Sequence, residues 1–176
     1  MAALAAAALL TGTAAATGCK AKRRTRVETV EEEAGPLASV VNMSEPRTAV
    51  QLVRGFYGLE HGAWRWTKSE FSITLRPPNG SAQAGARLEI KLTVPEAVLA
   101  KVGGSTSLSC NVSGQALEPE TYSKPGDFTY TRDVSPSVLT AEALSFDCKV
   151  AKFLAAGQVE ERELALIILG AGLVKK

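Results

Sequence analysis

The sequence has few of the residues on which most catalytic and metal sites depend. Its 176 residues include one histidine, three cysteines and only three aspartates. A single histidine, His61, leaves little for a Ser-His pair or a zinc centre to use. Calcium sites need several oxygen ligands in one loop, and the aspartates are scattered. These shortages predict a protein that is not an enzyme and that carries no metal and no cofactor.

Concentrated charge is also scarce. From Ser44 onward the chain has 15 basic and 14 acidic residues, so this part is nearly neutral. Such a balance gives no electrostatic footprint for nucleic acid, and we expect no nucleic-acid partner. Glu160, Glu161 and Glu163 form a local acidic group. A charged run before an apolar strand is typical of a solvated face. Two close carboxylates in a deep pocket would instead indicate a hydrolase.

The first 18 residues carry no charge. They read MAALAAAALLTGTAAATG, which predicts an export signal at residues 1–18, with an uncleaved N-terminal anchor as the alternative. Ala16-Thr17-Gly18-Cys19 resembles a bacterial lipoprotein box, in which the cysteine, here Cys19, is lipidated. Residues 19–43 are rich in charge and predict a flexible tether whose basic start contacts lipid headgroups. We therefore expect an exported, periplasmic or cell-surface protein that is anchored to the membrane.

Residues 44–176 show period-two alternation of polar and apolar side chains. Arg87–Val94 alternates without interruption, and residues 72–76, 128–131 and 144–150 follow the same pattern. Half-buried antiparallel strands have this pattern, because successive side chains point to opposite faces. Residues 163–169 predict a central strand, and residues 95–102 one short helical turn. We expect an all-β antiparallel sandwich of seven to eight strands with little helix.

The two remaining cysteines lie in apolar phase on predicted strands. Cys110 alternates with Leu108 and Val112, and Cys148 alternates with Phe146 and Val150. An oxidising compartment favours a disulfide between Cys110 and Cys148. Buried free thiols, which behave as small hydrophobic groups, are the alternative.

Both tryptophans lie in one short segment, Trp64-Arg65-Trp66. On a strand, Trp64 and Trp66 point to one face and Arg65 to the other. The apolar phase changes between Lys68 and Phe71, which predicts a bulge or break there. We expect Trp66 inside the sandwich and Trp64 at the start of the strand, partly exposed.

Several segments, in order along residues 50–174, resemble a module that occurs beside or fused to bacterial glycosyltransferases and envelope sugar proteins. They are Gly55-Phe56-Tyr57, Glu60, Trp64-Arg65-Trp66-Thr67, Pro125–Tyr130, Phe153 and Glu161–Ala165. The resemblance implies a galactose-binding-like jelly-roll sandwich. It also implies a role in binding an envelope carbohydrate. A structural or assembly module that docks onto a glycosyltransferase or another envelope protein is the alternative.

The candidate ligand-binding residues follow from this segment. We expect a sugar ring to stack on Tyr57 or Trp64. Glu60, His61 and Arg65 would supply polar contacts from a loop at the rim of the sandwich. Glu60 and Arg65 could instead form an ion pair that fixes the loop, at a gain of about 0 to 1 kcal/mol.

Overall fold

The computed structural model describes residues 36–176 of the chain. The predicted export signal, the lipidation site Cys19 and residues 19–35 of the predicted tether lie outside the described residues. Among the described residues, no helix combines the length and the hydropathy that a bilayer-spanning helix requires.

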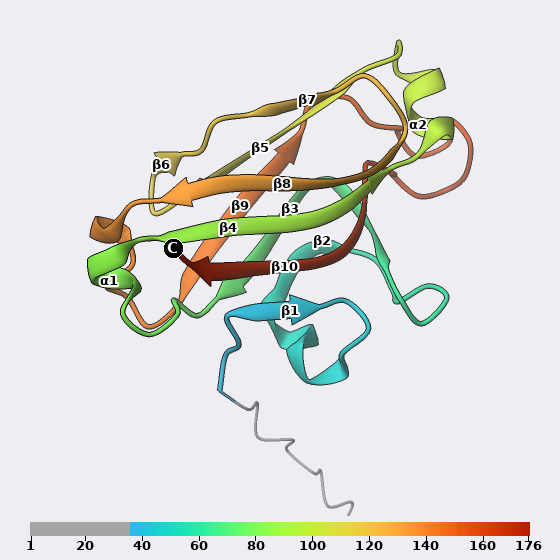
Figure 1. The fold of residues 1–176 in the computed structure, drawn as a ribbon. Helices are drawn as coiled ribbons and strands as arrows, with labels where there is room; N and C mark the ends of the chain where they lie inside the picture. The colour runs from blue at the N-terminus through green and yellow to red at the C-terminus, as the bar shows by residue number, and fades with distance from the viewer. Residues whose placement is uncertain (1–35) are drawn as a thin grey trace, which may run out of the picture. The chain divides into compact units, whose positions relative to one another are not determined.

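Residues 36–176 form an antiparallel β-sandwich, which confirms the predicted fold class (Figure 1). The layer that we call the front sheet contains, in order, β1 (Val40–Asn42), β10 (Ile167–Lys175), β4 (Ala86–Val94) and β8 (Gly126–Val134). The back sheet contains β2 (Leu52–Phe56), β3 (Arg65–Leu75), β9 (Leu144–Val150) and β5 (Thr106–Val112). Two short strands, β6 (Gln115–Ala116) and β7 (Glu120–Tyr122), pair with β5.

Helix is limited to short pieces between strands, as predicted. They are α1 (Ser81–Ala84), α2 (Glu96–Lys101) and two 3₁₀ turns, η1 (Pro46–Gln51) and η2 (Pro136–Val138). Helix α2 is the helical turn expected at residues 95–102. The described residues contain ten strands rather than seven or eight. The additional ones are two or three residues long, too short to show a period-two pattern.

The core lies between the two sheets and follows the alternation in the sequence. On β4, Leu88, Ile90 and Leu92 are fully buried, whereas the intervening side chains face solvent. Phe71 and Ile73 of β3 are each 1% exposed and belong to the same core. Burial of apolar surface at about 25 cal/mol per Å² is therefore the main force holding the layers together.

Strand β3 belongs to both layers. Its second half, Glu70–Leu75, pairs with β9 in the back sheet, while Arg65 and Trp66 pair with β10 of the front sheet. Opposite β2, the register shifts between Ser72 and Thr67. This irregularity confirms the break that the sequence predicts between Lys68 and Phe71.

Two predicted boundaries differ from the structure. Val40–Asn42 form β1 and pair with β10, so the folded chain begins before residue 44. The final strand begins at Ile167 and continues to Lys175, beyond the predicted range of 163–169. The glycines at 170 and 172 obscured that continuation, because glycine has low strand propensity.

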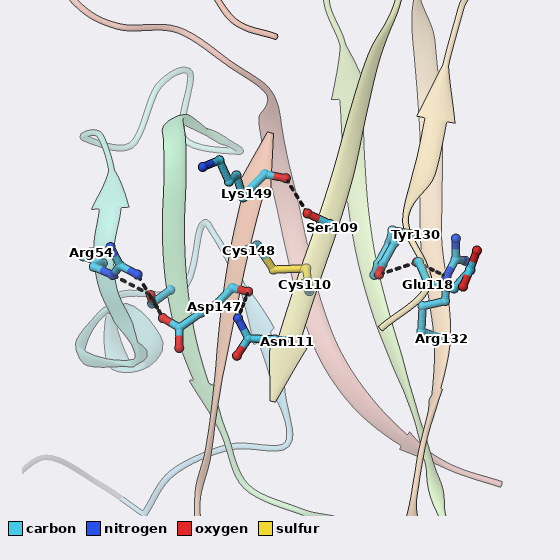
Figure 2. Close-up of a disulfide and its surroundings, with 11 residues drawn as sticks. Arg54, Ser109, Cys110, Asn111, Glu118, Tyr130, Arg132, Asp147, Cys148 and Lys149 are labelled. Atoms are coloured by element: carbon cyan, nitrogen blue, oxygen red, sulfur yellow. Dashed lines mark hydrogen bonds and ion pairs between the residues drawn. A yellow bond between two sulfur atoms is a disulfide. The ribbon is translucent and has the colours of Figure 1, made fainter. Parts of the chain in front are cut away.

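The predicted disulfide is confirmed. Cys110 of β5 and Cys148 of β9 lie directly opposite one another and are bonded, as Figure 2 shows. The two residues are 4% and 3% exposed, so the bond lies within the core. It links strands separated by 38 residues in sequence.

We predict that the Cys110→Ala/Cys148→Ala double variant loses about 3 to 4 kcal/mol of unfolding free energy. The reason is that the bond removes loop-closure entropy from the unfolded chain. Urea denaturation of the oxidised wild-type chain and of the variant measures the difference. An unchanged unfolding midpoint would show that the core holds these strands without the bond.

Candidate functional site

The segment between β2 and β3 folds into a tight turn that presents several of the predicted site residues. Glu60 and Trp64 pair as an isolated antiparallel bridge, and the Glu60 N–H donates to the Trp64 carbonyl at 2.9 Å. His61 and Gly62, between them, have φ values of 50° and 67°. Two consecutive positive φ values are typical of the tight turn that connects paired strands. Residues 60–64 are called the aromatic turn below.

Two rings stand side by side on the aromatic turn. The centroids of His61 and Trp64 lie 5.4 Å apart, with an angle of 31° between the ring planes. His61 is exposed and Trp64 is half-buried, in agreement with the partial exposure predicted for Trp64. The ring of Trp66 meets that of Trp64 edge to face, with 6.3 Å between centroids. The turn therefore carries an aromatic surface that is partly open to solvent.

The predicted position of Trp66 between the sheets is wrong. Trp66 is half-buried and packs against a separate small cluster formed by Val98, Leu154 and Leu164. Trp66 is an odd number of positions from Phe71 and Ile73, so alternation along β3 places its ring on the opposite side of the strand from these core residues. Its packing supports the aromatic turn from one end of the sandwich.

Arg162 holds the turn in place, and sequence reasoning missed it. Its guanidinium donates to Glu60 Oε1 at 2.7 Å and also pairs with Glu160. Its charged carbon lies 5.2 Å from the centre of the Tyr57 ring. The two carboxylates raise the pKa of Arg162, and Arg162 lowers the pKa of Glu160. In the sequence, residues 160–163 resembled a solvated face, because Glu60, the partner of Arg162, lies 102 residues earlier.

Arg65 does not pair with Glu60, so the ion pair considered from the sequence is wrong. Arg65 lies on the other side of the strand and donates to the Tyr57 carbonyl at 3.0 Å. Its Nε is buried and has no hydrogen-bond partner among residues 36–176. Arg65 thus fixes the backbone that enters the turn.

The structure places all five predicted residues in one segment but gives them different surroundings. His61 and Trp64 form the accessible surface of the turn. The Tyr57 ring has Arg162 on it, and Lys68 lies 5.9 Å from its centre. Glu60 accepts a hydrogen bond from Arg162, and Arg65 donates to the backbone carbonyl of Tyr57. Within residues 36–176 no group of three or more His, Cys, Asp or Glu side chains could hold a metal.

The outer face of the back sheet carries a network of charged side chains. Arg54 of β2 contacts Asp147 of β9 at 3.1 Å and Glu70 of β3 at 3.6 Å, and Lys149 also pairs with Glu70 (Figure 2 labels Arg54, Asp147 and Lys149). Hydrogen bonds from Ser72 and Arg54 hold the pKa of Asp147 below its usual value. The charged side chains of this face are therefore paired with one another.

The outer face of the front sheet contains a groove of about 480 Å³. Its floor includes Gly170 and Gly172 of β10, which lack side chains on this face. In register, Gly170 lies between Asn42 of β1 and Lys91 of β4, and Gly172 lies between Val40 and Glu89. The glycines thus leave a trough with side chains on both sides, which we call the glycine groove.

The glycine groove is continuous with the aromatic turn. Gly62 and Ala63 of the turn line the groove together with Val40 and Leu169, which are 60% and 36% exposed. No sequence signal identified this groove, because only the pairing of β1 and β4 on either side of β10 creates it. The turn and the groove together are the candidate site.

Comparison with known proteins yields structural similarity only. No family model matches the chain, and no curated protein matches it in sequence. The carbohydrate-binding module TmCBM27, studied for specific mannan recognition, superposes with a TM-score of 0.48 at 11% identity, covering 80% of this chain and 97% of that one. The C-terminal CBM6 of LamC, a marine laminarinase from Zobellia galactanivorans, gives a TM-score of 0.41 at 9% identity, with coverage of 77% and 98%.

We predict that Arg162→Ala loosens the aromatic turn with little loss of global stability. The variant loses two partly exposed ion pairs and the contact with Tyr57, and exposed pairs of this kind contribute little to global stability. Tryptophan fluorescence should shift towards that of solvated indole, because Trp64 and Trp66 lose their support. Arg87→Ala, which removes an ion pair with Asp133 on β8, is the matched control. Equal spectra for the two variants would contradict the role given to Arg162.

Proposed function

We propose that this chain is a non-catalytic carbohydrate-binding module of the cell envelope. The observation that carries the proposal is the aromatic turn, which carries the neighbouring His61 and Trp64 rings and whose Gly62 and Ala63 line the glycine groove. Sugar rings combine apolar C–H faces with a rim of hydroxyl groups. An aromatic surface beside polar side chains provides both kinds of contact.

In this proposal each predicted residue has a distinct part in binding. One sugar ring stacks on Trp64, and His61 contacts a hydroxyl beside it. Glu60 uses Oε1 to bind Arg162, which leaves Oε2 for a second hydroxyl. Tyr57 contributes its hydroxyl, since Arg162 and Lys68 lie over its ring. Arg65 acts through the Tyr57 carbonyl and keeps the turn in position.

The proposal includes attachment to the membrane. An export signal at residues 1–18 and lipidation at Cys19 would leave the basic tether at the bilayer surface. The disulfide between Cys110 and Cys148 supports an oxidising compartment such as the periplasm or the cell surface. A module tethered in this way would hold an envelope glycan close to the membrane.

A docking function is the second candidate. Val50 of η1 and Val53 of β2 are 61% and 59% exposed, and β2 pairs only with β3 among the described strands. Exposed apolar side chains at a sheet edge favour contact with another protein. The partner would be a glycosyltransferase or another envelope protein, and the module would then bind no sugar itself.

We predict that the full-length chain gives a specific signal on an array of bacterial glycans and that Trp64→Ala abolishes it. The substitution removes the stacking surface, which is worth about 1 to 3 kcal/mol, or roughly 5- to 150-fold in affinity. Trp64→Phe, which retains an aromatic ring, should keep part of the signal.

Val53→Ala is the matched control, since Val53 lies outside the turn and the groove. Circular dichroism and thermal unfolding should show that all variants remain folded. An array on which the folded wild-type chain binds nothing would move the assignment to protein docking. Loss of binding in Val53→Ala, with Trp64→Ala still binding, would place the sugar site at β2 and overturn the role given to the aromatic turn.

A further inference from the structure

The glycine groove does not end at β4. A second hollow of about 270 Å³ lies between β4 and β8 on the same face, and it shares Lys91 and Leu169 with the glycine groove. Phe128, Thr129 and Asp127 of β8 complete its lining. Because they share these residues, the two hollows adjoin across the front sheet, in which β1, β10, β4 and β8 are neighbours (Figure 1).

The strand register aligns the side chains of this face in a row. Asn42, Gly170, Lys91 and Thr129 lie opposite one another on β1, β10, β4 and β8. Adjacent strands are about 4.8 Å apart, so the row is about 14 Å long. It begins beside Gly62 and Ala63 of the aromatic turn. A ligand that stacks on Trp64 could thus continue along the row.

We infer, on the basis of the proposed function, that the front sheet binds a linear, uncharged glycan of several sugar units. One end of the glycan lies at Trp64, and the chain crosses β10, β4 and β8. Single sugars would fill only the aromatic turn. Length is therefore part of what the site recognises.

The charges of the row favour an uncharged ligand. Lys91 is the one charged residue of the row, and Glu89 on β4 and Asp127 in the second hollow flank it, so charges of both signs border the path. Such an arrangement creates no strong field of one sign, which a uronic-acid or phosphorylated polymer would require. These side chains can instead donate to and accept from hydroxyl groups.

The floor of the groove disfavours an extended peptide. Peptide recognition by strand addition needs an open sheet edge with unpaired backbone groups. Strand β10 is hydrogen-bonded to β1 on one side and to β4 on the other, and β4 is also bonded to β8. A chain lying across these strands is recognised through side chains, and the lining combines apolar groups (Val40, Leu169) with polar ones.

The test is the affinity of the full-length chain for oligosaccharides of increasing length, measured by calorimetry. The probes are β-1,4-linked gluco- and manno-oligosaccharides of one to six units, with oligogalacturonides of the same lengths as charged counterparts. We expect affinity for the best neutral series to rise at least tenfold between the two-unit and the longest member. Lys91→Met should remove most of that gain, because one charge-assisted hydrogen bond is worth about tenfold.

Thr129→Arg, which places a long side chain in the second hollow, should likewise remove the gain while leaving two-unit binding unchanged. Lys101→Met on α2 and Thr121→Arg on β7 are the matched controls, since both residues are exposed and lie outside the two hollows. Neither control should alter the dependence on length.

The outcomes separate this inference from the proposed function. If affinity levels off at two units, Lys91→Met binds as tightly as the wild-type chain and Trp64→Ala does not bind, the proposed sugar-binding module stands and the extended site is overturned. Tighter binding of the oligogalacturonides would overturn the assignment of an uncharged glycan. If neither the neutral nor the charged series binds, and the bacterial glycan array is also silent, both the inference and the proposed function fail.

Discussion

The structure depends on the point at which β3 passes from one layer to the other. Thr67 is fully buried there, its N–H donates to the Leu166 carbonyl at 2.8 Å, and its own carbonyl accepts from Ala165. This pairing joins β3 to the two residues that immediately precede β10. Because the sandwich is one curled sheet, the same contact determines where β10 begins. It also determines where the aromatic turn, which precedes β3, projects.

The candidate site is a consequence of that junction. Residues N-terminal to Thr67 lie outside the main core, so Trp66 packs against a small cluster at the end of the sandwich and Trp64 stays near solvent. On the other side of the junction, β10 places Gly170 and Gly172 on the outer face between β1 and β4. The aromatic turn and the glycine groove meet because both depend on one crossing of strands.

The two outer faces of the sandwich differ in the way their side chains are engaged. On the back sheet, Arg54, Asp147 and Glu70 are paired with one another. On the front sheet, the residues that line the hollows face a trough. The partners in these ion pairs lie far apart in the sequence, and so do Arg162 and Glu60, whose ion pair holds the aromatic turn. Surface ion pairs contribute little stability but can position a loop.

The sequence by itself determined the fold class, favoured the disulfide over free thiols and located the irregularity in β3. Alternation in β4 and β9 is a local pattern, and local patterns report which side of a strand faces the core. They also located the segment that carries Tyr57, His61 and Trp64. Only the tertiary structure decided that Glu60 binds Arg162 rather than Arg65, that Trp66 lies outside the main core, and that two glycines on β10 form a groove. Those features arise from contacts between residues that are distant in the sequence. A single sequence does not show which distant residues will be in contact.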